Sequence, residues 1–294
     1  MYDLIIIGSG PSGLTAAIYA SRYKLNTIII AKELGTLSDA HIVENYPGFT
    51  SITGLDIMNK FKEHVQYFKV PIIEEEVTEI KKEKNFKVHT DKKTYESKTI
   101  ILAIGTKRRK LNLPNEEKYL KKGITYCYTC DAPFMHDKTV AVIGGSDSAV
   151  QASLLLSEYA KKIYLMYRSE KLTAEPILVE KIKKIKKIEI MPCTEIKELK
   201  GSNFLSSVIL NNNKELKIEG LFVEIGAVPS VSLIKDLNVK TDNKGYIITN
   251  ELKETNIKGL FAAGDITTVP MRQAIVAAAD GAVAAFSAYK YCQK

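Results

Sequence analysis

Residues 2–13 of this chain have the sequence YDLIIIGSGPSG, an apolar run followed by a Gly-x-Gly-x-x-Gly turn. The continuous Ile run predicts a strand over residues 2–8 that is buried on both faces. The Ala-rich segment 12–23 predicts a helix, and the apolar segment 25–31 predicts a second strand. Together they form a strand–helix–strand unit with glycines at its first turn, the arrangement that binds dinucleotides.

The three glycines of this turn have separate roles. Gly8 permits the tight turn, Gly10 lets the backbone approach a pyrophosphate, and Gly13 allows contact between helix and strand. The N-terminus of the helix presents backbone N–H groups and a positive dipole end to phosphate. The pattern by itself does not distinguish FAD from NAD.

A second unit of the same kind lies later in the chain. Residues 139–143 predict a strand, 147–160 a helix and 162–167 another strand, with the glycine-rich turn GGSDSA at 144–149. A repeated nucleotide-binding unit predicts an α/β fold with two Rossmann-like, three-layer domains.

The connections between the two units predict that one domain is inserted in the other. Apolar strands are expected at 99–105 and 220–226, and each is followed by a stretch suited to a crossing point. We therefore expect a nucleotide domain at 112–232, inserted in a discontinuous domain made of 1–111 and 233–294. Two linkers crossing together would act as a hinge.

A Cys-x-x-Cys pair, Cys127 and Cys130, lies between the two glycine turns. Such a pair is a reversible two-electron store, whose thiolate fraction sets its reactivity and whose potential sets which disulfides it reduces. Asp131 follows directly and can supply a proton if burial raises its pKa. Two dinucleotide sites flanking one dithiol imply electron flow from a donor, through a flavin, to a disulfide.

The other cysteines and the histidines offer no competing chemistry. Cys193 and Cys292 are isolated and are expected to be ordinary small apolar residues. The Cys-x-x-Cys pair could be half of a zinc site, but no second Cys or His pair lies at suitable spacing. We therefore expect no metal.

Composition is that of a globular protein large enough for two domains, with 294 residues, 45% hydrophobic and 26% charged. Its apolar runs are too short to span a bilayer, and no leader-like segment precedes the first strand, so we expect a cytoplasmic protein. The net charge of +8 comes partly from the lysine run 181–188. Ile recurs there at every third residue, as on one face of a surface helix, and we expect no nucleic-acid binding. A basic surface could help to dock an acidic protein substrate.

The order and spacing of the motifs resemble the low-molecular-weight thioredoxin reductase family over nearly the whole chain. The motifs are the first glycine turn, VENYPG at 43–48, CYTCD at 127–131 and GLFAAGD at 259–265. The resemblance implies FAD as cofactor, thioredoxin or a similar small redox protein as partner, and a homodimer. In this family the dithiol cannot face flavin and partner at once, so the inserted domain must rotate.

The resemblance also implies which residues hold the flavin. Asp265 would accept a hydrogen bond from a ribityl hydroxyl, Asn45 would lie near the flavin, and the helix from Ala274 would stabilise negative charge on the reduced flavin. The acidic ribose ligand expected after the second strand is replaced by Ala31-Lys32-Glu33, so either Glu33 serves late or the ribose is held otherwise. The expected FAD residues are Gly8, Gly10, Pro11, Ser12, Gly13, Glu33, Asn45, Gly105, Gly264, Asp265, Arg272, Gln273 and Ala274.

The resemblance assigns a role to each residue of the dithiol motif. Cys130 lies against the flavin and receives its electrons, Cys127 attacks the substrate disulfide, and Asp131 donates and accepts the proton. Tyr128 stands where the family has a small residue, and it narrows access to the dithiol or stacks beside the flavin.

The second glycine turn departs from the family pattern. Ser146 replaces its second key glycine, and of the cations that select NADPH only Arg168 remains, with Lys171 nearby. We expect NADPH to be the donor, held by Gly144, Ser146, Asp147, Ser148 and Arg168. NADH, ferredoxin or a deazaflavin remain alternatives.

Three further functions fit parts of the sequence. A flavin dithiol oxidase would pass electrons from a substrate dithiol to oxygen. A flavin-binding redox sensor would not need both cysteines and Asp131, and a ferredoxin–NADP reductase of this architecture lacks the dithiol.

Overall fold

The chain divides into two compact units. In a computed structural model that describes residues 1–293, apart from the side chain of Ser232, unit 1 consists of Met1–Lys107 and Val228–Lys294, and unit 2 of Arg108–Ala227. Unit 2 is therefore inserted in the sequence of unit 1.

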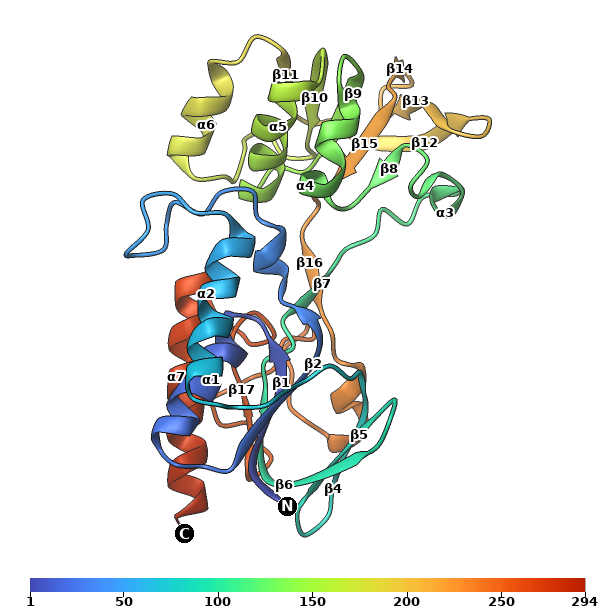
Figure 1. Cartoon of the computed structure of the whole chain (residues 1–294). Helices are drawn as coiled ribbons and strands as arrows, with labels where there is room; N and C mark the ends of the chain where they lie inside the picture. Colours follow the sequence, from blue (N-terminus) through green and yellow to red (C-terminus); the bar gives the residue numbers. More distant parts are fainter. Residues whose placement is uncertain (294) are drawn as a thin grey trace. The chain divides into compact units, whose positions relative to one another are not determined.

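Unit 1 is an α/β structure (Figure 1). Its strands are β1 (Tyr2–Ser9), β2 (Thr27–Leu34), β3 (Ile72–Ile73), β4 (Val77–Lys82), β5 (Phe86–Thr90), β6 (Thr94–Leu102) and β17 (Leu260–Ala262). Its helices are α1 (Pro11–Arg22), η1 (Thr36–Asp39), α2 (Gly54–Tyr67), η3 (Ser232–Leu237) and α7 (Ala274–Cys292).

The sheet of unit 1 has the strand order β3-β2-β1-β6-β5-β4, with β17 also paired to β6. Strands β1, β2, β3, β6 and β17 run parallel, and β4 and β5 are antiparallel additions. Side chains of β1 alternate between two cores: Leu4 and Ile6 pack with α1, α2 and α7, whereas Ile5 and Ile7 pack on the other face. Burial on both faces explains why the strand is a continuous apolar run.

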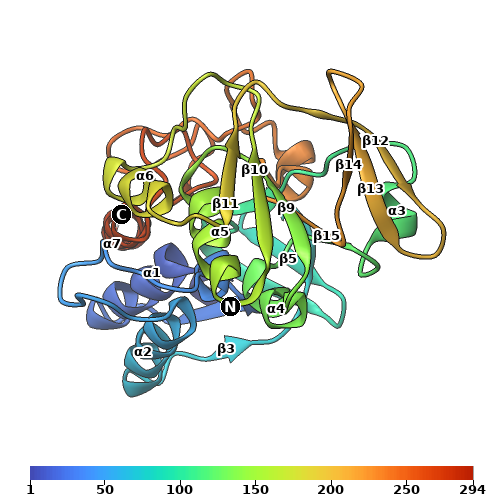
Figure 2. The ribbon, with the colours of Figure 1, turned by 90° about the horizontal axis from the view of Figure 1, so that it is seen from above.

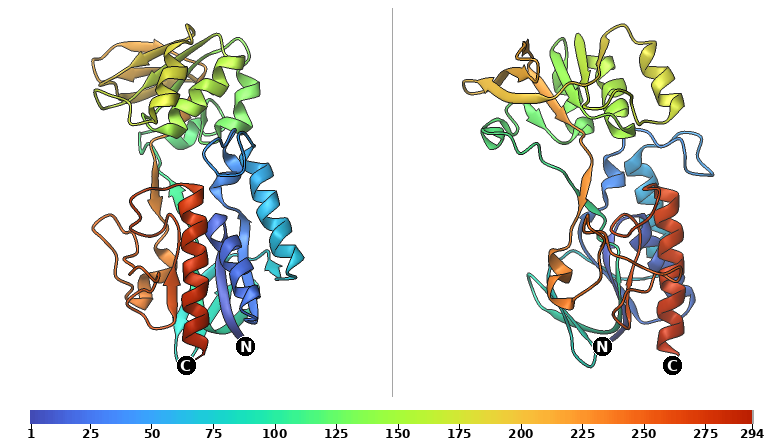
Figure 3. Two further views of the ribbon diagram at one scale, coloured as in Figure 1. Left: turned by 90° about the vertical axis from the view of Figure 1, so that its left-hand side faces the viewer. Right: turned by 180° about the vertical axis from the view of Figure 1, so that it is seen from behind.

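Helices α1 and α7 pack closely against one another on the same face of this sheet (Figure 3). A Cβ at Gly281 of α7 would lie 2.0 Å from the backbone oxygen of Ser12 on α1. Glycine at this position therefore brings α7 against the first turn of α1, beside the glycine turn.

Unit 2 has the same construction at smaller size. Its strands are β8 (Ile124–Thr125), β9 (Thr139–Ile143), β10 (Lys162–Met166), β11 (Ile188–Met191), β12 (Ile196–Gly201), β13 (Leu205–Leu210), β14 (Glu215–Lys217) and β15 (Gly220–Val223). Its helices are α3 (Glu116–Tyr119), α4 (Tyr128–Asp131), η2 (Ala132–Met135), α5 (Asp147–Tyr159) and α6 (Pro176–Lys183).

The parallel sheet of unit 2 has the order β11-β10-β9-β15-β8, which Figure 2 shows from β11 to β15. Val140 and Val142 of β9 face α5, and Ala141 faces the opposite core with the antiparallel β12-β13-β14 sheet. The prediction of two Rossmann-like, three-layer domains is confirmed.

The chain passes between the units through two short strands, β7 (Thr106–Arg108) and β16 (Ala227–Pro229), which pair with each other. Next to them, the amide of Arg109 donates to the carbonyl of Gly226 at 3.0 Å. The domain limits expected at 111/112 and 232/233 stay a prediction.

One secondary-structure prediction was wrong. The lysine run 181–188 is not helical throughout, since α6 ends at Lys183 and β11 begins at Ile188. Ile182, Ile185 and Ile188 nevertheless all pack against the α5 side of the sheet, because the chain bends back into it. The isoleucines therefore recur at every third residue because the end of α6 and the start of β11 contribute to the same hydrophobic core.

Within residues 1–293, no helix combines the length and apolar character that a membrane span requires.

Candidate active site

The glycine turn of unit 1 leaves space at one position only. A Cβ added to Gly8 would lie 2.2 Å from the carbonyl oxygen of Ala103. A Cβ added to Gly13 would lie 2.0 Å from the carbonyl oxygen of Gly8. At Gly10 the nearest atom would be the Cα of Gly35, 3.8 Å away. Gly10 caps α1, whose first residues are Pro11 and Ser12. This open cradle at a helix N-terminus fits the pyrophosphate of a dinucleotide.

Glu33 lies beside this turn but within a strand. Strand β2 continues to Leu34, and the Ser9 hydroxyl donates to the backbone oxygen of Glu33 at 2.7 Å. The exposed side chain of Glu33 borders a small cavity of about 50 Å³. The cavity is lined by Ser9, Ala31, Lys32, Glu33, Leu34, Lys62, Ile72 and Glu74.

The segment after β17 returns to the same turn. Gly264 lies against Ser12, since an added Cβ would be 2.8 Å from the Ser12 Oγ, and its N–H donates to Oδ2 of Asp280 at 3.3 Å. Burial raises the pKa of the neighbouring Asp265, with Asp280 acting in the same direction and Arg272 against it. Asp265 is thus held next to the first turn of α1.

Asn45 and Gln273 are 228 positions apart and meet in the structure. The side-chain Nδ2 of Asn45 donates to Oε1 of Gln273 at 3.2 Å. Gln273 lies directly before Ala274, the first residue of α7. The guanidinium of Arg272 stacks on the Tyr246 ring at 3.9 Å. Gly105, by contrast, precedes β7 at φ +58° with open space around it.

Cys127 and Cys130 form a disulfide, with their Cα atoms 5.4 Å apart. Cys127 caps the short helix α4, and its Sγ accepts from the amide of Cys130 at 3.3 Å. Cys130 is exposed, Cys127 is half-buried, and Tyr128 between them is 4% exposed and packs in the α5 core.

Asp131 is joined to the dithiol through Thr125. The Thr125 hydroxyl donates to Oδ2 of Asp131 and accepts from the amide of Cys127 at 3.0 Å. The Asp131 carboxylate is half-buried. Thr125 was not among the residues expected from sequence, because a hydroxyl two residues before the first Cys follows no recognised spacing.

The glycine turn of unit 2 is hydrogen-bonded to a later segment of the chain. Ser146 caps α5 in an extended conformation that any residue adopts, and its hydroxyl lies 3.3 Å from that of Ser148. Thr173 donates to the Gly145 carbonyl from its amide at 2.8 Å and from its hydroxyl at 3.1 Å. The amide of Glu175 donates to Oδ1 of Asp147 at 2.7 Å. Segment 173–175 is therefore tied to the turn.

Gly144 keeps the conformation that the turn requires, with φ +139° and an added Cβ 2.0 Å from the Glu224 oxygen. Arg168 is exposed after β10. Among residues 1–293 no cluster of three or more His, Cys, Asp or Glu side chains is arranged to hold a metal.

Comparison with known proteins agrees with this geometry. Residues 2–281 match the model of the family described as pyridine nucleotide-disulphide oxidoreductase. The chain is 41% identical to the 34.2 kDa protein in the rubredoxin operon of Clostridium pasteurianum, over 98% of this chain and 96% of that protein.

Two solved structures are also similar. The thioredoxin reductase of Lactococcus lactis is 35% identical with a TM-score of 0.97, covering 100% of this chain and 99% of that one. A ferredoxin-flavin thioredoxin reductase of Clostridium acetobutylicum is 32% identical with a TM-score of 0.54, covering 98% and 97%. The chain belongs to the pyridine nucleotide-disulphide oxidoreductase family, and within it to the low-molecular-weight thioredoxin reductases.

Proposed function

We propose that this chain is an FAD-dependent thioredoxin-disulfide reductase. The observation that carries the proposal is the Cys127–Cys130 disulfide, which is connected to Asp131 by the hydrogen bonds of Thr125. This disulfide lies in unit 2, which is inserted in the sequence of a Rossmann-like domain. The similarity to thioredoxin reductases over the full chain supports thioredoxin, or a similar small redox protein, as the partner.

The dithiol residues account for the exchange step. The Cys127 thiolate attacks one sulfur of the partner disulfide, forms a mixed disulfide and releases a partner thiolate, which takes a proton from Asp131. Asp131 next accepts the proton of the Cys130 thiol, and the resulting Cys130 thiolate attacks the Cys127 sulfur. This restores the Cys127–Cys130 disulfide and releases the second partner thiolate, which takes that proton from Asp131. Two electrons and two protons pass to the partner. The bound FAD supplies the two electrons that return the disulfide to the dithiol.

Unit 1 provides the residues that we propose for FAD. Gly10 and the α1 N-terminus receive the pyrophosphate, Asp265 accepts from a ribityl hydroxyl, and Asn45 with Gln273 lies near the flavin ring. The domain limits proposed with this assignment are 1–111 and 233–294 for FAD and 112–232 for the donor domain. A homodimer and a cytoplasmic location are proposed from the family resemblance.

NADPH is the donor that we propose first. The family implies a pyridine nucleotide, the φ of Gly144 is retained, and Arg168 is exposed after β10 to meet a phosphate.

Ferredoxin is the second candidate, and a specific observation favours it. Ser146 places a Cβ where the second glycine of a dinucleotide turn lets the backbone approach the pyrophosphate. The similarity to a ferredoxin-flavin thioredoxin reductase supports the same candidate.

An anaerobic titration of the FAD-loaded protein separates the donors. Flavin absorbance is followed while NADPH, NADH or reduced ferredoxin is added separately, and thioredoxin is then supplied. Bleaching within seconds by NADPH, followed by thioredoxin reduction, is the expected result. If only reduced ferredoxin bleaches the flavin, ferredoxin takes the place of NADPH as the proposed donor. If the enzyme reduced by dithionite leaves thioredoxin oxidised, the reductase proposal is overturned.

A further inference from the structure

Arg108 connects both chain crossings to the strand that carries the dithiol. It is the last residue of β7 and the first residue of unit 2. Its Nη1 donates to the backbone carbonyl of Tyr126 and lies 3.0 Å from Oε1 of Glu224. Glu224 follows β15 on the returning crossing. Residues from the outgoing and the returning crossing therefore meet beside Tyr126.

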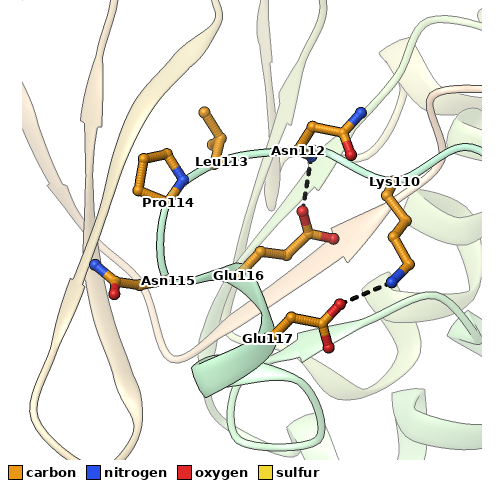
Figure 4. Close-up of a pocket in the computed structure, with 7 residues that line it drawn as sticks. All are labelled: Lys110, Asn112, Leu113, Pro114, Asn115, Glu116 and Glu117. Atoms are coloured by element: carbon orange, nitrogen blue, oxygen red, sulfur yellow. Dashed lines mark hydrogen bonds and ion pairs between the residues drawn. The ribbon is translucent and has the colours of Figure 1, made fainter.

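The other end of Tyr126 is held by the loop after β7. Its hydroxyl donates to Oε1 of Glu116 and accepts from the amide of Leu111 at 3.0 Å. Glu116 is only 4% exposed, and its Oε2 accepts from the amide of Asn112 at 2.7 Å, as Figure 4 shows. Burial, followed by the hydrogen bond with Glu116, raises the pKa of Tyr126, so its hydroxyl stays a donor. We call Arg108, Glu116, Tyr126 and Glu224 the Tyr126 clamp.

The same loop borders an open cavity of about 490 Å³, and the exposed Glu117 pairs there with Lys110 at 2.7 Å (Figure 4). These contacts lie on the solvent side of the loop, whereas Glu116 is directed inward to Tyr126.

The clamp acts on the peptide unit next to the nucleophilic cysteine. The Tyr126 carbonyl and the Cys127 amide belong to one planar peptide group. Arg108 holds the carbonyl, and Thr125 accepts from the amide at 3.0 Å. Because both polar atoms of this group are bonded, the peptide plane that carries the Cα of Cys127 is held in place.

The charge balance of the clamp is asymmetric. The side chain of Glu224 is 8% exposed, and that of Arg108 is 29% exposed. A carboxylate buried to this degree requires a cationic partner. Arg108 therefore presents its positive charge directly at the Tyr126 carbonyl, and Glu224 partly offsets it. The second carboxylate of the clamp, Glu116, lies at the far end of the Tyr126 side chain, on its hydroxyl.

We propose that Arg108 is a positioning residue for the dithiol: through the Tyr126 carbonyl it orients Cys127 and supplies positive charge that favours the attacking thiolate. The inference rests on the proposed role of Cys127 as nucleophile. The proposal means that Arg108, at the end of the outgoing crossing strand β7, directly affects the reactivity of the Cys127 thiol.

Other charged groups lie on α4 or on the elements that pack against it, and they stay constant in the test. Asp131 lies on α4 itself, Asp147 and Glu158 lie on α5, and His136 follows η2 in an ion pair with Asp137. Glu116 belongs to the clamp. Comparison among variants at Arg108 and Glu224 therefore isolates the contribution of this pair.

The experiment measures alkylation of Cys127 by iodoacetamide as a function of pH, in the full-length FAD-loaded Cys130→Ser protein. Modification is followed on the Cys127 peptide by mass spectrometry, because Cys193 and Cys292 also react. Arg108→Gln, Arg108→Lys and Glu224→Gln are compared with Lys107→Gln, which removes an exposed positive charge from the same strand.

Arg108→Gln is expected to move the midpoint of the pH profile upward and to slow alkylation at pH 7 by about tenfold, the factor that one pKa unit represents. Lys107→Gln should leave the rate within about twofold, because exposed charges are screened. Glu224→Gln should accelerate alkylation, since its amide oxygen still accepts from Arg108 while the negative charge is lost. Arg108→Lys should restore a rate within about threefold of the parent.

Three results would overturn the proposal: an unchanged midpoint in a folded Arg108→Gln protein, equal shifts for Lys107→Gln and Arg108→Gln, or slower alkylation in Glu224→Gln. If Arg108→Gln does not fold, the other two variants decide the outcome. Faster alkylation in Glu224→Gln, with a near-parental rate in Arg108→Lys, supports the proposal, and slower alkylation in Glu224→Gln overturns it. Failure of the proposed function is separate, because alkylation requires neither an electron donor nor thioredoxin.

Discussion

Gly10 and Gly13 differ in what a methyl group would meet, and this predicts two distinct phenotypes. A Cβ at Gly10 has only the Gly35 Cα at 3.8 Å, whereas one at Gly13 would lie 2.0 Å from the Gly8 oxygen. Gly10→Ala should leave the apoprotein as stable as wild type but weaken FAD binding by about 1–3 kcal/mol, the usual cost of an extra methyl in a packed contact. Thermal unfolding of the apoprotein and FAD titration by fluorescence measure the two quantities.

Gly13→Ala is the matched control, because its methyl collides with backbone whether or not FAD is bound. It should lower the unfolding temperature of the apoprotein as well as the affinity for FAD. A Gly10→Ala protein that binds FAD as tightly as wild type would show that no pyrophosphate approaches Gly10.

At the scale of elements, α7 is tied to the loop before β17 by an ion pair that is largely buried. Lys253 lies 2.6 Å from Oδ1 of Asp280, and their side chains are 18% and 8% exposed. The other carboxylate oxygen of Asp280 accepts from the amide of Gly264. The pair therefore connects α7, the loop and the turn that precedes Asp265.

Lys253→Met should lower the free energy of unfolding by about 3–5 kcal/mol, because it leaves the carboxylate of Asp280 buried without its cation. Lys253→Met/Asp280→Asn should recover most of this loss, since an amide oxygen can still accept from Gly264. Lys258→Met removes an exposed lysine of the same loop and should change stability by less than about 0.5 kcal/mol. Urea denaturation measures all three, and an equal effect of Lys253→Met and Lys258→Met would contradict the structural role.

At the scale of the whole molecule, unit 2 is one continuous segment with its own packed layers. Arg108–Ala227 contains two cores, one on each face of its sheet. Its ends lie together, since the Arg109 amide donates to the Gly226 carbonyl. Segments of this kind are able to fold alone.

An excised fragment 108–227 is therefore expected to unfold in one cooperative transition, with a stability of about 5–15 kcal/mol, as is usual for a domain. Circular dichroism during urea denaturation measures the transition, and mass spectrometry after thiol labelling detects the Cys127–Cys130 disulfide. A broad transition without fixed tertiary packing would mean that unit 2 depends on unit 1.

Several elements were predictable from local pattern alone. Strand β9 begins and ends at Thr139 and Ile143 as expected, and α5 and α7 begin at Asp147 and Ala274. Buried parallel strands are continuous apolar runs, and glycine turns require glycine for steric reasons, so both leave marks in neighbouring residues. The end of β2 at Leu34 was missed because Leu34 pairs with Ser9 of β1 after a register shift, beyond the apolar run.

Local sequence patterns were sufficient for the two nucleotide-binding units and the dithiol, because each depends on residues a few positions apart. The packing of distant segments decided which side chains meet. Asn45 bonds to Gln273, Lys253 pairs with Asp280, and Arg108 joins Glu224 to the peptide before Cys127. Such contacts have no sequence period, since they depend on the path of the whole chain, and a polar side chain finds its partner only when the sheets have formed.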